Sequence, residues 1–149
     1  MSANDAEFKI WVPGDPVTKG SVKTITDKKT GKGIVIPDNK RTKPWQRAVS
    51  DVAALHWGGA EFWTGPVALV LNFSLPFSRQ ANYEGQWHVE KFDIDKLARA
   101  ILDALTKVVY KDDAQVAMLS TCKSYSRDSG VKIEAWQLEE VENYAKSKA

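Results

Sequence analysis

Residues 93–116 of this 149-residue chain read DIDKLARAILDALTKVVYKDDAQV, and this stretch decides the fold. Its apolar residues recur at intervals of three and four, which predicts a helix from Ile94 to Val108 with one buried face. That face consists of Ile94, Leu97, Ala98, Ile101, Leu102, Leu105 and Val108. A short link at Tyr110–Asp113 must then turn the chain back. We expect a strand over Val116–Tyr125, which can run antiparallel along the helix.

The segments before and after this stretch predict further strands and one more helix. Pro66 and Pro76 bound the strongest strand, Val67–Leu75. Pro44 suits the first turn of a helix that runs to about Trp57, with Thr42 as a possible N-cap. The remaining predicted elements are strands at Phe8–Val12 and Val131–Leu138, two weak β stretches at Ser21–Thr26 and Gly33–Ile36, and a polar loop over 77–91.

Together these elements predict an α/β (α+β) fold, in which a small mixed β-sheet packs with two α-helices. The length fits a single domain over residues 1–149, and we expect 1–6 and 140–149 to be frayed. Apolar residues make up 43% of the chain, which is enough to bury a core.

Composition also excludes several classes of protein. No apolar run approaches the roughly 18–20 residues that a membrane span needs, and residues 1–7 do not resemble a signal peptide. A single cysteine, Cys122, excludes an internal disulfide framework and a cysteine-based zinc site. It suits a reducing cytosol, so we expect a cytoplasmic protein with no membrane partner and no small-molecule cofactor.

The net charge of +2 hides a strong asymmetry along the chain. Between Thr18 and Arg47 the charge is +7, and the remainder carries −5. The nine basic residues of this segment are Lys19, Lys23, Lys28, Lys29, Lys32, Lys40, Arg41, Lys43 and Arg47. Such a segment favours a polyanionic partner such as DNA or RNA, although a solvated, lysine-rich hairpin would show the same pattern.

Acidic residues gather at the two ends of the second helix. Asp93 and Asp95 flank its start, where they could serve as N-cap and first-turn acid, and Asp112-Asp113 could form a turn before the strand. If these acids converge, their mutual repulsion requires a cation. Mg²⁺ is the natural choice, because it prefers a few carboxylates with water and phosphate oxygens, and no histidine or cysteine cluster favours zinc.

Asp95, Arg99 and Asp103 follow one another at four-residue intervals along a polar edge of the helix. Arg99 could bridge the two acids. It could equally stabilise the charge that develops on a phosphate as its phosphorus is attacked.

These residues resemble a known family. An Asp-x-Asp pair heads an amphipathic helix, a basic residue follows four positions later, and then come Asp-Ala-Leu-Thr-Lys and Asp-Asp-Ala-Gln-Val (residues 103–107 and 112–116). This pattern is similar to that of the RusA family of Holliday junction resolvases. The likeness is densest over residues 93–116 and extends to Lys19-Gly20, Lys43-Pro44-Trp45 and the predicted strands.

The resemblance implies a homodimeric, Mg²⁺-dependent endonuclease that nicks four-way DNA junctions symmetrically, with Mn²⁺ as a possible substitute. By position, Asp93, Asp95 and Asp113 match the catalytic, metal-binding aspartates of the family, with Asp112 and Asp103 secondary. Arg99 stands where the family usually has a catalytic lysine, and Lys96 where it usually has asparagine. The residues expected to contact DNA are Lys19, Lys23, Lys40, Arg41, Lys43, Arg47 and Lys96.

Two other functions fit parts of the pattern. In a non-catalytic protein that binds branched DNA, Lys96 and Arg99 would neutralise the acids. In a phosphatase, Asp-x-Asp would supply nucleophile and acid, but that motif normally ends a buried strand, and residues 87–92 make a poor one. His88 is interpreted as a loop histidine. An aromatic residue of the 77–91 loop, Tyr83 or Trp87, could wedge open the centre of a junction.

Overall fold

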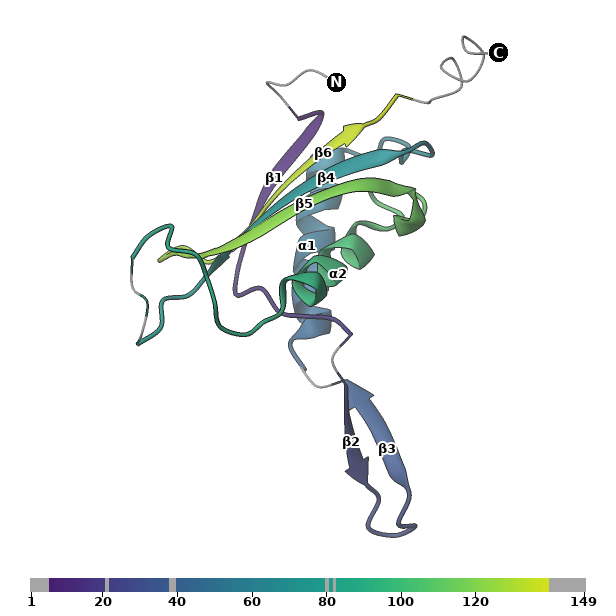
Figure 1. The fold of residues 1–149 in the computed structure, drawn as a ribbon. Coiled ribbons are helices and arrows are strands. Elements are labelled where there is room, and N and C mark those ends of the chain that lie inside the picture. Colours follow the sequence, from purple (N-terminus) through teal and green to yellow (C-terminus); the bar gives the residue numbers. More distant parts are fainter. Residues whose placement is uncertain (1–5, 21, 38–39, 80, 82, 140–149) are drawn as a thin grey trace, which may run out of the picture.

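Four of the predicted strands pair into one mixed β-sheet. In the computed structural model, which describes residues 6–20, 22–37, 40–79, 81 and 83–139, its strands lie in the order β1–β6–β4–β5 (Figure 1). Strand β6 runs antiparallel to both neighbours, whereas β4 and β5 are parallel, as predicted for a mixed sheet. The strands are β1 (Phe8–Pro13), β4 (Val67–Leu75), β5 (Val116–Tyr125) and β6 (Gly130–Gln137).

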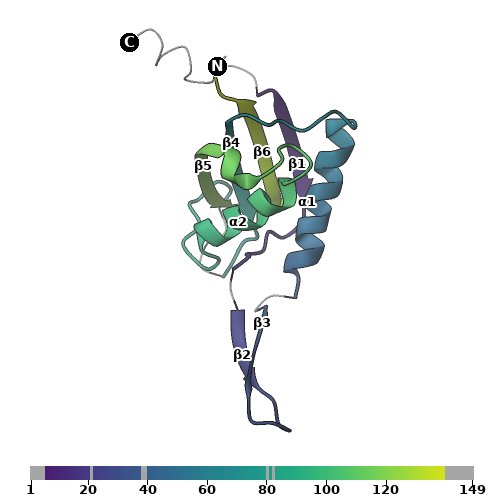
Figure 2. The same cartoon turned by 90° about the vertical axis from the view of Figure 1, so that its right-hand side faces the viewer.

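Helices α1 (Thr42–Trp57) and α2 (Ile94–Leu105) cover the same face of this sheet (Figure 2). Side chains alternate along a strand, so every second residue of β4, from Val67 to Leu75, enters the core beneath the helices. Polar contacts fix one helix against the other. The Ser50 hydroxyl donates to the carbonyl of Ala104 (2.7 Å), and the Gln46 amide donates to that of Ala100 (3.1 Å). None of the helices in the described ranges is long and apolar enough to cross a membrane.

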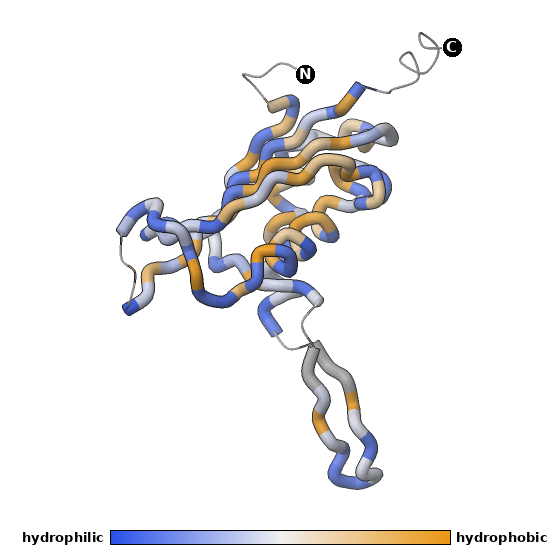
Figure 3. The backbone as a smooth tube through the Cα atoms, in the orientation of Figure 1, coloured by the Kyte–Doolittle hydropathy of each residue, from blue (hydrophilic) through white to orange (hydrophobic). Residues whose placement is uncertain are grey.

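Strands β2 (Val22–Thr26) and β3 (Gly33–Pro37) form a separate antiparallel hairpin that projects from the body (Figures 1 and 3). The Asp27 carboxylate closes its tip by accepting hydrogen bonds from the Lys29 amide (2.9 Å) and the Thr30 hydroxyl (3.1 Å). The two predicted β stretches are therefore confirmed as strands, and they pair with each other.

The opposite face of the sheet has no helix over it among the described residues, and Trp11 is exposed there. Strand β5 lies at the edge, with Met118 and Leu119 exposed. The loop before α2 covers only the last residues of this edge, because the amide of His88 donates to the carbonyl of Lys123 (3.1 Å). The rest of the β5 edge is open within the described part of the chain.

The structure corrects two details of the prediction. Helix α2 ends at Leu105 and not at Val108, because Thr106 adopts an extended conformation and its hydroxyl turns back to the Leu102 carbonyl (3.1 Å). Thr42 is not the N-cap of α1; Arg41 occupies that position, and the Thr42 hydroxyl donates instead to the Thr18 carbonyl (2.7 Å). The frayed ends predicted at 1–6 and 140–149 lie almost wholly outside the described residues.

Candidate functional site

Asp93 and Asp95 project from the N-terminus of α2, and both are exposed. Asp93 is the N-cap residue by backbone position, but its carboxylate makes no capping hydrogen bond. Its nearest cation is Lys96, 3.9 Å away, so this lysine pairs loosely with Asp93. Within the described residues the Asp95 carboxylate has no hydrogen bond and no ion pair. The two carboxylates therefore remain available to a ligand, at a helix end whose dipole favours negative charge.

The loop before α2 is anchored by a lysine of β5. The Lys123 ammonium donates to the carbonyls of Glu90 and Phe92, each at 2.7 Å. Burial lowers the pKa of Lys123, and the nearby Asp93 opposes that shift. This cation fixes the backbone immediately before Asp93.

Arg99 lies on the exposed side of α2 beneath Gly20, where any β-carbon would overlap its guanidinium. The neighbouring amide of Lys19 donates to the Lys96 carbonyl (3.1 Å), which ties this segment to the helix. Asp103 is bound by the Lys19 ammonium (2.6 Å) and the Gln46 amide (3.0 Å), so it serves to hold the segment in place. Arg99 does not bridge Asp95 and Asp103.

Asp112 and Asp113 have different surroundings: the carboxylate of Asp112 makes a structural hydrogen bond, and that of Asp113 makes none among the described residues. Asp112 caps a short 3₁₀ turn, η1 (Asp113–Gln115), by accepting from the Ala114 amide (2.8 Å), while the Gln115 side chain accepts from the Asp112 amide (2.9 Å). Gln115 also donates to the carbonyls of Trp63 and Gly65, which docks the turn on the body. The carboxylate of Asp113 is exposed and, among the described side chains, unpaired.

One chain does not bring the three aspartates together. Asp93 lies beside Lys123, near the end of β5, whereas Asp113 lies just before its start. The seven residue-to-residue steps from Val116 to Lys123 span roughly 23 Å of strand, and α2 is about 18 Å long. Accordingly, no cluster of three or more His, Cys, Asp or Glu side chains suited to a metal ion exists among the residues described.

Most of the residues predicted to contact DNA lie on the basic segment from Lys19 to Arg47, whereas Lys96 lies on α2. Of these, Lys40, Arg41, Lys43 and Arg47 are exposed where the chain enters α1. Three further lysines of the same segment, Lys28, Lys29 and Lys32, are exposed at the hairpin tip. Lys23 belongs to β2, but its side chain lies outside the described part of the structure. The basic charge of the segment therefore continues from the projecting arm to the body.

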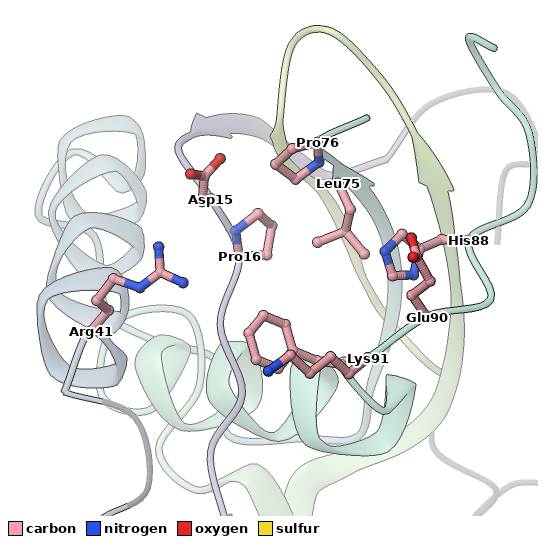
Figure 4. Close-up of a pocket in the computed structure, with 9 residues that line it drawn as sticks. Asp15, Pro16, Arg41, Leu75, Pro76, His88, Glu90 and Lys91 are labelled. Carbon is pink, nitrogen blue, oxygen red and sulfur yellow. The ribbon is translucent and has the colours of Figure 1, made fainter. Parts of the chain in front are cut away.

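A cavity of about 290 Å³ opens beside the start of α2 (Figure 4). Its wall includes His88, which is 9% exposed and packs against Tyr125, with 4.5 Å between the ring centroids and the rings tilted by 41°. The Tyr125 hydroxyl donates to the Glu90 carboxylate (2.6 Å) and lowers its pKa. Burial lowers the pKa of His88, and the Lys123 ammonium adds to that effect.

Sequence reasoning missed Lys123, Glu90 and this cavity. One signal was present: Lys123 pairs with Phe73, whose side chain enters the core, so a charged residue occupies an inward position of an alternating strand. The loop side chains of Tyr83 and Trp87 are 74% and 68% exposed, as a residue that wedges open a junction would need to be. Asp93 and Asp95 follow a loop and not a strand, which disfavours the phosphatase.

Comparison with known proteins bears directly on the predicted family. The model of the family described as endodeoxyribonuclease RusA matches residues 13–135, which include every aspartate discussed above. The chain is also similar to the uncharacterized protein YqaN of Bacillus subtilis (strain 168). The two are 27% identical over 136 residues, which cover 85% of this chain and 93% of that protein.

Proposed function

Because the chain belongs to the RusA family of endodeoxyribonucleases, we propose that it resolves four-way DNA junctions by paired, symmetric nicks that depend on Mg²⁺ or Mn²⁺. The observation that carries the proposal is the pair Asp93 and Asp95. A helix N-terminus normally engages the carboxylate of its N-cap residue, and here that carboxylate makes no capping hydrogen bond, which supports a role in binding a ligand.

Asp93, Asp95 and Asp113 are the proposed metal ligands, since a hard divalent cation prefers carboxylate oxygens. The cation would supply an activated water and neutralise the leaving 3′ oxygen. Attack of that water on phosphorus breaks the bond to the 3′ oxygen and leaves a 5′-phosphate and a 3′-hydroxyl. Arg99 faces the same exposed side of α2 and is proposed to hold the equatorial phosphate oxygens.

The distance between the aspartates makes a second copy of the chain part of the proposal. Asp113 lies about 20 Å from Asp93, so the three can share a cation only when Asp113 comes from another protomer. A homodimer with two such sites also matches the two-fold symmetry of a four-way junction.

The open edge of β5 is the surface that fits this second copy. Exposed Met118 and Leu119 lie in the first half of the strand, and an unpaired edge favours strand pairing. If two β5 strands pair antiparallel about this point, the start of one strand lies beside the end of the other. Asp113 of one protomer then approaches the loop and helix start that carry the partner's Asp93.

The basic segment is proposed to bind the DNA backbone. Lysines at the hairpin tip and the basic start of α1 offer charges for successive phosphates, so affinity is expected to fall steeply with salt. Phosphate contacts position the duplex arms but carry no sequence information.

Cleavage of a synthetic mobile four-way junction in Mg²⁺ tests the proposal. Asp95→Asn and Asp113→Asn should each abolish nicking. Asp112→Asn is the matched control, because asparagine caps a helical turn about as well as aspartate, so nicking should persist. Equal nicking by wild type and Asp95→Asn would refute the site.

Mixing the two inactive variants tests the shared site. In a mixed dimer both substitutions fall in one composite site, and the other site has all its native aspartates. Nicking of a single strand should therefore return. If each chain held a complete site, every site in the mixture would carry a substitution, and nicking would not return.

One observation favours a second candidate, a non-catalytic protein that binds branched DNA. Lys96 lies 3.9 Å from Asp93 and partly neutralises it. Tight junction binding without cleavage at any Mg²⁺ or Mn²⁺ concentration would support that function.

A further inference from the structure

The cavity beside the start of α2 is formed by four separate segments of the chain (Figure 4). Asp15 and Pro16 follow β1, Arg41 is the N-cap residue of α1, Leu75 ends β4 and Pro76 follows it, and His88, Glu90, Lys91 and Phe92 precede α2. The last of these is joined directly to Asp93. A group bound in the cavity would therefore lie next to the proposed metal ligands.

The lining of the cavity combines apolar surfaces with charged groups of both signs. Pro16 and Leu75 are buried, and Pro76 and Phe92 add further apolar surface. Carboxylates (Asp15, Glu90) and cations (Arg41, Lys91) surround this surface. The carboxylates would repel a free phosphate, whereas a planar ligand with donors and acceptors around its edge suits both parts of the lining.

The wall on the side of α2 is held rigidly. Lys123 fixes the carbonyls of Glu90 and Phe92, and Tyr125 fixes the Glu90 carboxylate and packs against the ring of His88. His88 is buried, yet its Nδ1 has no hydrogen-bond partner within the described residues. An unpaired buried polar atom destabilises the fold, so the hydrogen bonding of His88 does not explain the conformation of this loop.

We propose that this cavity takes one unstacked nucleobase of the DNA strand that is cut. The inference rests on the proposed function and names the part of the substrate that the site reads. The volume, about 290 Å³, is near the low end of small-molecule sites, as a single base requires. Removing a base from the stack costs least where pairing is already interrupted, as at the centre of a junction. The carboxylates can accept from exocyclic amines, and Arg41 can donate to ring nitrogens and carbonyls.

The experiment places 2-aminopurine at successive positions across the cleaved phosphate of a synthetic junction. Wild-type protein is bound in Ca²⁺, and a denaturing gel checks that the strand remains intact. An unstacked base should raise the fluorescence sharply at one position. Pro76→Trp, at the exposed rim, should fill the cavity and remove the rise. Val89→Trp is the matched control, because Val89 is 85% exposed on the same loop and does not line the cavity.

A second pair of variants tests how the base is read. Glu90→Gln replaces an acceptor-only group with one that also donates, and it should change the base preference of cleavage at the fluorescent position by about threefold to tenfold. Glu134→Gln on the opposite face of the sheet should leave it unchanged. Thermal melts check that each variant folds.

The outcomes separate the two proposals. If wild type cleaves the junction but no position brightens, or if Pro76→Trp brightens as wild type does, the base site is wrong and the nuclease stands. If wild type neither binds nor cleaves any junction, both are overturned.

Discussion

Replacing His88 by phenylalanine should stabilise the fold, which is an unusual outcome for a buried position. The His88 ring packs against the ring of Tyr125 in a tilted contact, and phenylalanine keeps that contact. The substitution removes a buried Nδ1 that has no partner among the described residues. Relief of that desolvation is worth about 1–2 kcal/mol. For a chain of this length each kcal/mol raises the melting temperature by about 2–4 °C.

The effect should grow as the pH falls. Burial and Lys123 lower the pKa of His88 below its ordinary value of 6.5, although Glu90 acts in the opposite direction. As the pH drops below 6.5, the unfolded chain binds a proton at His88 that the folded chain binds only at lower pH. Stability is therefore lost as the pH falls through this range. The pKa of Glu90 is lowered from 4.5, so its effect begins at lower pH and stays separate.

Melting temperatures of wild type and His88→Phe at pH 8 and pH 5.5 test both statements. The variant should melt higher at pH 8, and the gap should widen at pH 5.5. His56→Phe is the matched control, because the other histidine is exposed near the end of α1 and should show neither change. A variant that melts below wild type at pH 8, or a gap that does not widen, would refute the reasoning.

Three further substitutions test the supports of the site. Gly20→Ala should force the Arg99 guanidinium aside and slow junction cleavage by about tenfold to hundredfold, whereas Gly31→Ala, also at positive φ but with nothing nearby, should cleave at the wild-type rate. Gln115→Leu should lower the free energy of unfolding by about 2–3 kcal/mol in urea, because three backbone groups lose their partner. Lys123→Met should speed hydrogen exchange in the loop before α2, since two carbonyls lose their donor; unchanged exchange there would contradict its anchoring role.

The sequence predicted most of the fold because the relevant signals are local. Prolines bound β4, and α2 carries a clear apolar stripe. The end of α2 was missed by three residues, because Val108 continues the apolar spacing although the chain has already left the helix at Thr106. Hydrophobic spacing reports burial, and a partly buried residue beyond the helix end, here Val108, fits the same spacing.

The candidate site was less accessible to sequence reasoning, because its geometry depends on packing between distant segments. The acids at both ends of α2 are visible in the sequence, but their separation follows from β5 running back along the helix. Asp112 caps the 3₁₀ turn while the Asp113 carboxylate stays unpaired among the described side chains, and this difference depends on Gln115 docking against the segment before β4. The cavity joins four segments, of which only the loop before α2 is adjacent to the motif.

The segment that leads into the hairpin connects the two proposed DNA-binding parts of the chain. The amide of Lys19 is bonded to the backbone of α2, its ammonium holds Asp103, and Gly20 covers Arg99. The β2–β3 hairpin is proposed to engage a duplex. The segment that leads into it therefore lies directly beside Arg99, the side chain proposed to hold the scissile phosphate. Because Asp103 takes part in this attachment, its place on the polar edge of α2 is explained without any role in metal binding. The orientation of a junction arm and the position of Arg99 then depend on the same few contacts.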